Sequence, residues 1–278
     1  MRKVLGLVGA TLLFAGPAFA ADLPVKAPAM PLGPVFSWTG FYLGGEVGAK
    51  WADTTWTTTS LTDTNFVRPI DGTSPRGFNP VGARVGGYLG YNWQFAPQWV
   101  GGFEADMAWA DKTETAAGLP GCARPVANTC GLISAPGPGV DLSSVKMGWD
   151  ASVRARLGFL VTPQLLLYGT GGVAWQQLET SGTCQHSAPD PYCFVEPGNP
   201  FVTVTNSTVR TGWTVGGGLE ANIYGNWLLR GEYRYSDFGT WNNAFNFNVV
   251  GETPGFDTYR FHLKATTQIA TIGLAYKF

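Results

Sequence analysis

The chain ends in the sequence Lys264-Ala-Thr-Thr-Gln-Ile-Ala-Thr-Ile-Gly-Leu-Ala-Tyr-Lys-Phe278, in which two kinds of side chain alternate. One face of an extended segment would carry Ala270, Ile272, Leu274, Tyr276 and Phe278, and the other Thr271, Gly273, Ala275 and Lys277. Successive side chains of a β-strand point to opposite faces, so this period of two predicts a strand. Because one face is wholly apolar, we expect this strand to face an apolar environment on that side.

Seven further segments show the same alternation, so eight strands are predicted. We expect them at residues 38–51, 80–94, 99–111, 145–161, 165–178, 207–223, 227–238 and 264–278. Three connections are short, at residues 95–98, 162–164 and 224–226, and contain turn residues such as Pro97 and Pro163. The other four are long, at residues 52–79, 112–144, 179–206 and 239–263. Short and long connections that alternate predict an antiparallel up-and-down arrangement.

The composition excludes a helix-rich protein and indicates an unusually apolar surface. The 278 residues include 38 Gly and 19 Pro, too many for a protein built from long helices. Only 13% of the chain is charged, about half the share of a soluble domain. The net charge is −1 and no basic patch is present, so nucleic-acid binding is not expected.

Residues 1–20 have the features of a secretory signal peptide. Arg2 and Lys3 precede an apolar run, and the small residues Ala18 and Ala20 form a cleavage motif. Residues 21–37 are Pro-rich and are predicted to be an extended periplasmic segment. Residues 38–278 form the predicted barrel domain.

No apolar run after the signal approaches the roughly 20 residues that a transmembrane helix needs. In a bilayer only helices and closed barrels satisfy every backbone polar group. The sequence therefore predicts an all-β protein, an eight-stranded antiparallel up-and-down transmembrane β-barrel with short periplasmic turns and four long extracellular loops. The alternative is a soluble lipocalin-like barrel or a β-sandwich, whose outer face should be charged.

The polar faces of the predicted strands carry charged residues that we expect in the lumen. These residues are Glu46, Lys50, Arg84, Glu104, Asp106, Asp150, Arg154, Arg156, Glu220, Arg230, Glu232, Arg234 and Lys277. The interior of an eight-stranded barrel is just filled by side chains, so these six acids and seven bases are predicted to form ion pairs that plug it. A narrow ion path is the alternative. Trp and Tyr near the strand ends, Trp38 among them, are predicted to form an interfacial girdle, whereas Tyr168 falls on the inward face and leaves its strand ambiguous.

Four cysteines lie in two of the long connections. Cys122 and Cys130 lie in the second, and Cys184 and Cys193 in the third. An even number of cysteines in an exported chain predicts disulfides, for which three connectivities are possible. A metal site of Cys184, His186 and Cys193 is the alternative, but an oxidising envelope favours disulfides.

Three segments of the chain carry a resemblance to a known family. They read Phe36-Ser-Trp-Thr-Gly-Phe-Tyr-Leu-Gly-Gly-Glu-Val-Gly48, Leu229-Arg-Gly-Glu-Tyr-Arg-Tyr-Ser-Asp-Phe-Gly239 and Ile272-Gly-Leu-Ala-Tyr-Lys-Phe278. Together they resemble the small alphaproteobacterial outer-membrane proteins, the porin-family or outer membrane immunogenic protein group, which share the OmpA-like eight-stranded barrel. The resemblance implies the outer membrane of a Gram-negative bacterium, surface exposure, and contact with lipid and lipopolysaccharide. Tyr276 and Phe278 resemble the signal that the outer-membrane assembly machinery reads.

The sequence gives little support for catalysis. It contains only two histidines, His186 and His262, and no Gly-x-Ser-x-Gly elbow, so an enzyme acting on outer-membrane lipid would have to use His262. Some members of the resembled family are described as hemin binders or adhesins, which would make His186, His262, Tyr192 or Tyr259 hemin ligands. We expect no cofactor and a structural, surface-interacting role, namely envelope integrity and loop presentation to extracellular ligands. A small porin or a hemin-binding surface receptor is the alternative.

Overall fold

The computed structural model describes residues 36–62, 67–122, 141–185, 201–248 and 256–278. The predicted signal peptide, residues 1–20, and all but the last two residues of the predicted Pro-rich segment lie outside this description. In the part of the chain that the structure describes, no helix is long and apolar enough to cross a membrane.

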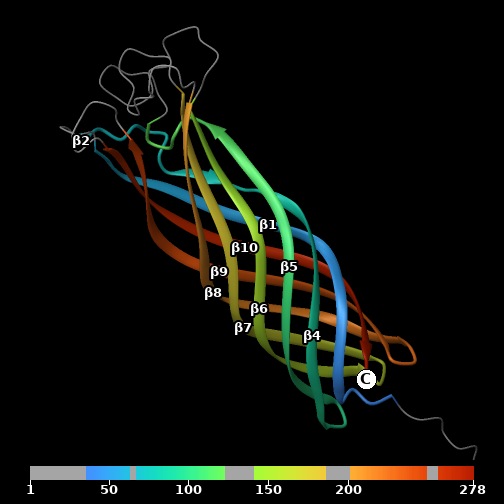
Figure 1. Cartoon of the computed structure of the whole chain (residues 1–278). Coiled ribbons are helices and arrows are strands. Elements are labelled where there is room, and N and C mark those ends of the chain that lie inside the picture. The colour runs from blue at the N-terminus through green and yellow to red at the C-terminus, as the bar shows by residue number, and fades with distance from the viewer. Residues whose placement is uncertain (1–35, 63–66, 123–140, 186–200, 249–255) are drawn as a thin grey trace, which may run out of the picture. The chain divides into compact units, whose positions relative to one another are not determined.

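Eight long antiparallel strands form a closed ring (Figure 1). They are β1 (Gly40–Thr62), β4 (Val81–Ala96), β5 (Trp99–Ala117), β6 (Leu142–Thr162), β7 (Leu165–Gln185), β8 (Phe201–Tyr224), β9 (Trp227–Asn248) and β10 (Phe256–Lys277). Each pairs with the next in this order, and β10 pairs with β1, which closes the barrel. Two short strands, β2 (Val67–Arg68) and β3 (Arg76–Phe78), also pair with β1. The predicted eight-stranded antiparallel barrel is confirmed.

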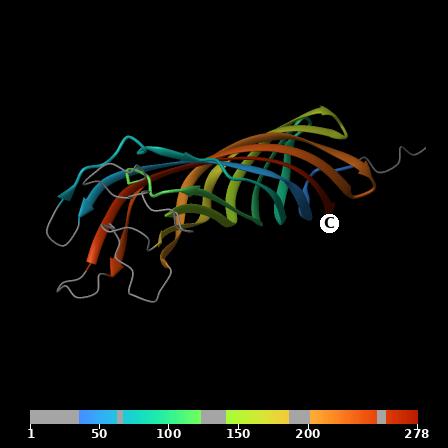
Figure 2. The same cartoon turned by 90° about the horizontal axis from the view of Figure 1, so that it is seen from above.

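The two ends of the barrel differ in their connections. The two-residue turns at residues 97–98, 163–164 and 225–226 lie at the end that also holds the C-terminus (Figures 1 and 2). The strand ends that border the long connections lie at the opposite end. We call these the turn end and the loop end. In transmembrane barrels of this architecture the short turns face the periplasm, so the loop end is extracellular.

The strands continue further toward the loop end than the sequence predicted. β9 continues past its predicted end at Phe238 to Asn248, and β10 begins at Phe256 rather than Lys264. Part of each long connection is therefore strand. The longest strand, β8, has 24 residues, about twice the 9–11 that a tilted strand needs to cross a bilayer.

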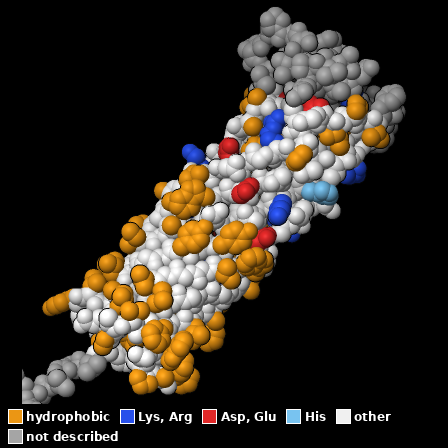
Figure 3. Space-filling model, turned by 180° about the vertical axis from the view of Figure 1, so that it is seen from behind, with side chains coloured by type: hydrophobic (Ala, Val, Ile, Leu, Met, Phe, Trp, Pro, Cys, Tyr) orange, Lys and Arg blue, Asp and Glu red, His pale blue; other side chains and the backbone are white. Residues whose placement is uncertain are grey.

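The outer surface of the barrel has two zones. From the turn end to the level of Trp51, Trp109 and Trp213, the large outward side chains are apolar and exposed, and the face drawn in Figure 3 shows the charged side chains only toward the loop end. Outward residues of this apolar zone include Phe41, Leu43, Val47, Val85, Leu89, Phe103, Val153, Leu157, Leu219, Ile272 and Leu274. Residues 99–109 of β5 cross the apolar zone, a length that matches a bilayer.

Near the loop end the pattern reverses, so that polar side chains lie outside and apolar ones inside. On β10, Arg260 and Lys264 are exposed, whereas Tyr259, Phe261 and Leu263 are buried. Their burial against Trp56, Phe78 and Phe245 of other strands forms an apolar cluster inside the barrel. We call this cluster the loop-end core, because it lies between the apolar zone and the loop end.

A β-bulge at Gly239 switches the inward face of β9 at the boundary between the zones. Two residues of β9, Phe238 and Gly239, oppose one residue of β10, and Gly239 has a φ of 69°, which favours glycine. Below the bulge the even-numbered Arg234 faces inward, and above it the odd-numbered Phe245 does so. A constant period of two cannot follow this switch, so the predicted strand ends at Phe238. On β10 the odd-numbered residues face inward from Tyr259 to Lys277, and there the reversed polarity of the two faces ends the predicted strand at Lys264.

Candidate functional site

Twelve charged side chains inside the barrel form one connected network of ion pairs. The acids are Glu46, Glu104, Asp106, Asp150, Glu220 and Glu232, and the bases are Lys50, Arg84, Arg154, Arg156, Arg230 and Arg234. None of the twelve residues is more than 7% exposed. We call this set the lumen network, and its six negative and six positive charges balance.

Asp106 is the point at which three arginines of the lumen network meet. Arg234 donates hydrogen bonds to both carboxylate oxygens of Asp106, at 2.7 and 3.1 Å. Arg84 donates to Asp106 at 2.6 Å, and Arg154 donates to it at 3.3 Å. Because Asp106 lies on β5 and the arginines on β9, β4 and β6, one carboxylate joins four strands across the interior.

Arg84 and Asp150 extend the lumen network toward the loop end. Arg84 also pairs with Glu46, and its Nη2 donates to Asp150 at 2.8 Å. Lys50 donates to Asp150 at 2.8 Å and contacts the amide oxygen of Gln176. A desolvated charge is costly unless it is paired and hydrogen-bonded, and these contacts meet both conditions.

Three tyrosines complete the lumen network toward the turn end. The hydroxyl of Tyr42 donates to Glu104 at 2.8 Å, and that of Tyr168 donates to Glu232 at 2.9 Å. The guanidinium of Arg230 lies 3.4 Å from the ring centroid of Tyr88, a cation–π contact. Sequence reasoning assigned these tyrosines no role, although the inward parity of Tyr42 and Tyr168 was the signal that could have identified them.

Apolar clusters lie on both sides of the lumen network. The turn-end cluster consists of Trp38, Tyr42, Tyr88, Val100, Leu160, Leu166, Tyr168, Leu228 and Ala275. The loop-end core contains the fully buried Trp56, whose indole stacks on Phe261 with ring centroids 4.2 Å apart. Inside the barrel, the lumen network thus lies between two apolar clusters.

Two residues lack the surroundings that were predicted for them. Lys277 lies inward, but its ammonium donates to the backbone oxygens of Thr39 and Phe278, at 3.0 and 3.3 Å, and does not join the lumen network. It is the last residue of β10, beyond the turn-end cluster that separates it from the carboxylates. Trp38 does not belong to an interfacial girdle, because it is fully buried at the turn end of the barrel, where its indole N–H donates to the Pro163 oxygen at 3.1 Å.

Cys122 and Cys184 are buried in the loop-end core, and each takes part in a disulfide. Cys130, His186, Tyr192 and Cys193 lie outside the described residues, so the pairing of the cysteines and any role of His186 and Tyr192 stay predictions. Within the described ranges, no group of three or more His, Cys, Asp or Glu side chains could hold a metal ion.

The two other candidate hemin ligands both lie in β10 rather than in a loop. Tyr259 is fully buried, its hydroxyl donates to the Pro120 oxygen at 2.6 Å and lies 2.7 Å from the Thr58 hydroxyl, and burial raises its pKa. The interpretation of Tyr259 as an accessible loop ligand is therefore wrong. His262 is partly exposed, and its Nδ1 lies 2.5 Å from the amide oxygen of Asn242.

A closed antiparallel barrel with an apolar outer zone and a charged interior defines a transmembrane β-barrel protein. The family model described as "Outer membrane protein beta-barrel domain" matches residues 7–278. The chain belongs to this family, and its place is the bacterial outer membrane.

Known relatives agree with this assignment. The chain is 31% identical over 286 residues to the 31 kDa outer-membrane immunogenic protein of Brucella melitensis, with 100% of both chains covered. It is 29% identical over 213 residues to the 22 kDa outer membrane protein of Rhizobium leguminosarum bv. viciae, covering 77% of this chain and 69% of that one. Among solved structures, OprG from Pseudomonas aeruginosa matches with a TM-score of 0.46 and 12% identity, covering 86% of this chain and 96% of that one. The predicted membership in the alphaproteobacterial immunogenic protein group is confirmed.

Proposed function

We propose that the protein is a structural, surface-presenting component of the outer membrane whose lumen is closed. The observation that carries this proposal is the lumen network, in which every charged group has an oppositely charged partner. An ion that passed through the barrel would have to separate desolvated pairs, and breaking such a pair costs about 3–5 kcal/mol. The interior of an eight-stranded barrel is also just wide enough for side chains.

The loop-end core supports the presenting part of this role. The strands continue beyond the apolar zone and are held together by Trp56, Phe245 and Phe261. Binding residues are commonly carried by loops on a rigid scaffold. We therefore propose that the barrel holds its four long connections at the cell surface, where they meet extracellular ligands and lipopolysaccharide.

The C-terminus supports recognition by the outer-membrane assembly machinery. Tyr276 and Phe278 are exposed on the outer face of the barrel, and their rings contact each other edge to face with centroids 5.3 Å apart. A pair of exposed aromatic rings at the chain end is a surface that a protein receptor can read before lipid covers it.

A deletion strain separates the structural role from that of a small porin. Without the protein we expect greater uptake of the hydrophobic dye N-phenyl-1-naphthylamine and greater sensitivity to detergent, because the envelope is weakened. Uptake of a hydrophilic cephalosporin should not fall, and the wild-type gene should restore the barrier. The lipid composition, measured by mass spectrometry, should not change, because we propose no enzymatic role. A fall in cephalosporin uptake with an intact barrier would instead show a pore.

A further inference from the structure

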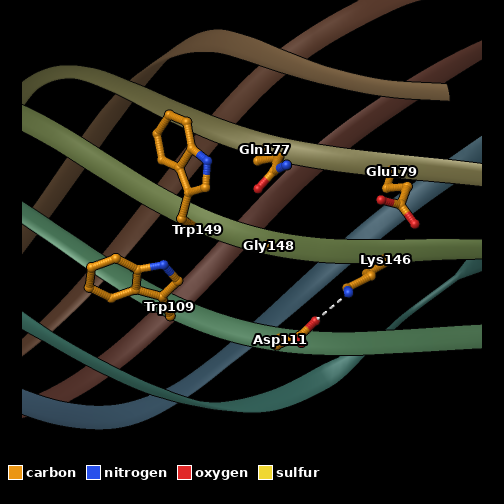
Figure 4. A pocket seen from close by; sticks show the side chains of 7 residues that line it. All are labelled: Trp109, Asp111, Lys146, Gly148, Trp149, Gln177 and Glu179. Carbon is orange, nitrogen blue, oxygen red and sulfur yellow. Dashed lines mark ion pairs between the residues drawn. The ribbon is translucent and has the colours of Figure 1, made fainter.

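A notch of about 200 Å³ opens on the outer face of β5, β6 and β7. Figure 4 shows that Trp109 and Trp149 lie at one end of it and that Asp111, Lys146 and Glu179 lie at the other. None of these side chains belongs to the lumen network or to either apolar cluster. The notch is therefore a separate feature that the proposed structural role does not explain.

The notch exists because the strand pairing shifts at Gly148. β5 and β6 pair in register up to Trp109 and Trp149, after which two residues of β5 oppose Gly148. On the other side, Gly148 and Trp149 together oppose the single residue Gln177 of β7. A Cβ on Gly148 would lie 2.5 Å from the Gln177 amide oxygen, so any larger residue would displace this side chain. The glycine thus keeps the amide of Gln177 in the lining of the notch.

The notch lies at the level of the lipid headgroups in the outer leaflet. Phe103 and Met107, on the same outer face of β5 as Trp109 and closer to the turn end, are exposed in the apolar zone. Beyond Trp109 the same strand carries the exposed Asp111. Indole rings at such a boundary are expected in any transmembrane barrel, but here two of them border a hollow that also holds charged groups and an amide.

The polar groups of the notch suit a neutral ligand rich in hydroxyl groups. Lys146 pairs with Asp111 at 3.1 Å, which leaves Glu179 as the carboxylate not used in that pair. The two carboxylates accept hydrogen bonds, Lys146 donates, and Gln177 does both. The three charges sum to −1, so the notch disfavours an anion such as free phosphate.

We propose that the notch binds the saccharide headgroup of an outer-leaflet glycolipid. A sugar ring has an apolar C–H face that stacks on an indole, and hydroxyl groups at its edge that pair with carboxylates and amides. The two ends of the notch supply these two kinds of partner, at the depth at which the first sugars of such a lipid lie. The proposal rests on the outer-membrane location and is independent of whether the lumen is closed.

The test uses the folded full-length mature protein in detergent micelles and isothermal titration calorimetry. The probe is the core oligosaccharide released by mild acid from rough lipopolysaccharide, with its phosphate groups removed and its carboxyl groups reduced so that it is neutral, and phosphatidylglycerol vesicles serve as the phospholipid probe. We expect saturable binding of the oligosaccharide, weakened about tenfold by Trp109→Ala, by Glu179→Gln and by Gly148→Val. Trp213→Ala is the matched control, because Trp213 is 51% exposed against 54% for Trp109 but lies outside the notch.

Heat-modifiable gel migration shows for each variant that the barrel has folded. Folded notch variants that bind the oligosaccharide as well as the wild type would overturn the proposal, as would a Trp213→Ala variant that loses binding to the same extent. Binding of phosphatidylglycerol with no binding of the oligosaccharide would show a phospholipid site and would also overturn it. If the wild-type protein binds the oligosaccharide but also conducts ions, the saccharide site is supported and only the proposed closed lumen is contradicted.

Discussion

Replacement of Asp106 by asparagine is expected to destabilise the folded barrel by about 3–5 kcal/mol, the usual cost of removing one partner from a buried ion pair. The substitution keeps the shape of the side chain and removes its charge. Arg84, Arg154 and Arg234 all donate to this carboxylate, and all are at most 3% exposed. Three desolvated guanidinium groups would therefore lose a shared counterion, and water cannot replace it.

The free energy of unfolding is measured by urea titration in lipid vesicles, with tryptophan fluorescence as the signal. Asp53→Asn is the matched control, because Asp53 is exposed on the outer face and surface substitutions typically change stability by no more than about 0.5 kcal/mol. If Asp106→Asn does not fold at all, the loss of heat-modifiable migration reports the same effect. An Asp106→Asn variant as stable as Asp53→Asn would contradict the assignment of Asp106 as the centre of the lumen network.

Replacement of Trp56 by alanine is expected to cost about 3–5 kcal/mol, the range found for buried aromatic residues. Trp56 is fully buried and contacts Phe78, Phe245, Tyr259 and Phe261 in the loop-end core. The cavity left by this substitution would lie on the loop-end side of the apolar zone, outside the lipid. The damage should therefore concentrate in the loop-end part of the barrel, since stability is not uniform across a structure.

Limited proteolysis of the protein in lipid vesicles measures this local effect. Trp56→Ala should be cut rapidly in the loop-end part, while a lipid-protected barrel remains. Trp51→Ala removes an indole from the opposite face of the same strand, where it is exposed, and should leave the cleavage rate near that of the wild type. Equal cleavage of the two variants would mean that the loop-end core does not hold this part of the barrel together.

The membrane-crossing part of the fold could be predicted from the sequence because its alternation is uninterrupted. On β5, the apolar Phe103 and Met107 and the acidic Glu104 and Asp106 follow a constant period of two. In the structure the first pair faces outward and the second pair faces inward. The loop-end part could not be predicted in this way, because there the inward face becomes apolar and the outward face polar, and because the bulge at Gly239 also changes the parity of β9. A sequence pattern that is read with one fixed period loses the strand at such a point.

The inward residues of the candidate site were recognisable from parity alone, but their partners were not. Arg84 and Asp150 are 66 residues apart in sequence, and only the closed ring of strands places them in contact. Lys277 has the correct parity but lies too close to the chain end to reach a carboxylate. The notch at Gly148 was also not predictable, because its bulge depends on how β5 and β7 pair with β6.

Single-channel recording in a planar lipid bilayer tests the closed lumen most directly. The purified, folded wild-type protein is added to a bilayer in concentrated potassium chloride, and a general porin from the same membrane serves as the positive control. The lumen network between two apolar clusters predicts no stable open level above the baseline. Steady steps of uniform conductance from the wild-type protein would contradict the closed lumen, and with it the proposal that this barrel serves as a scaffold rather than a pore.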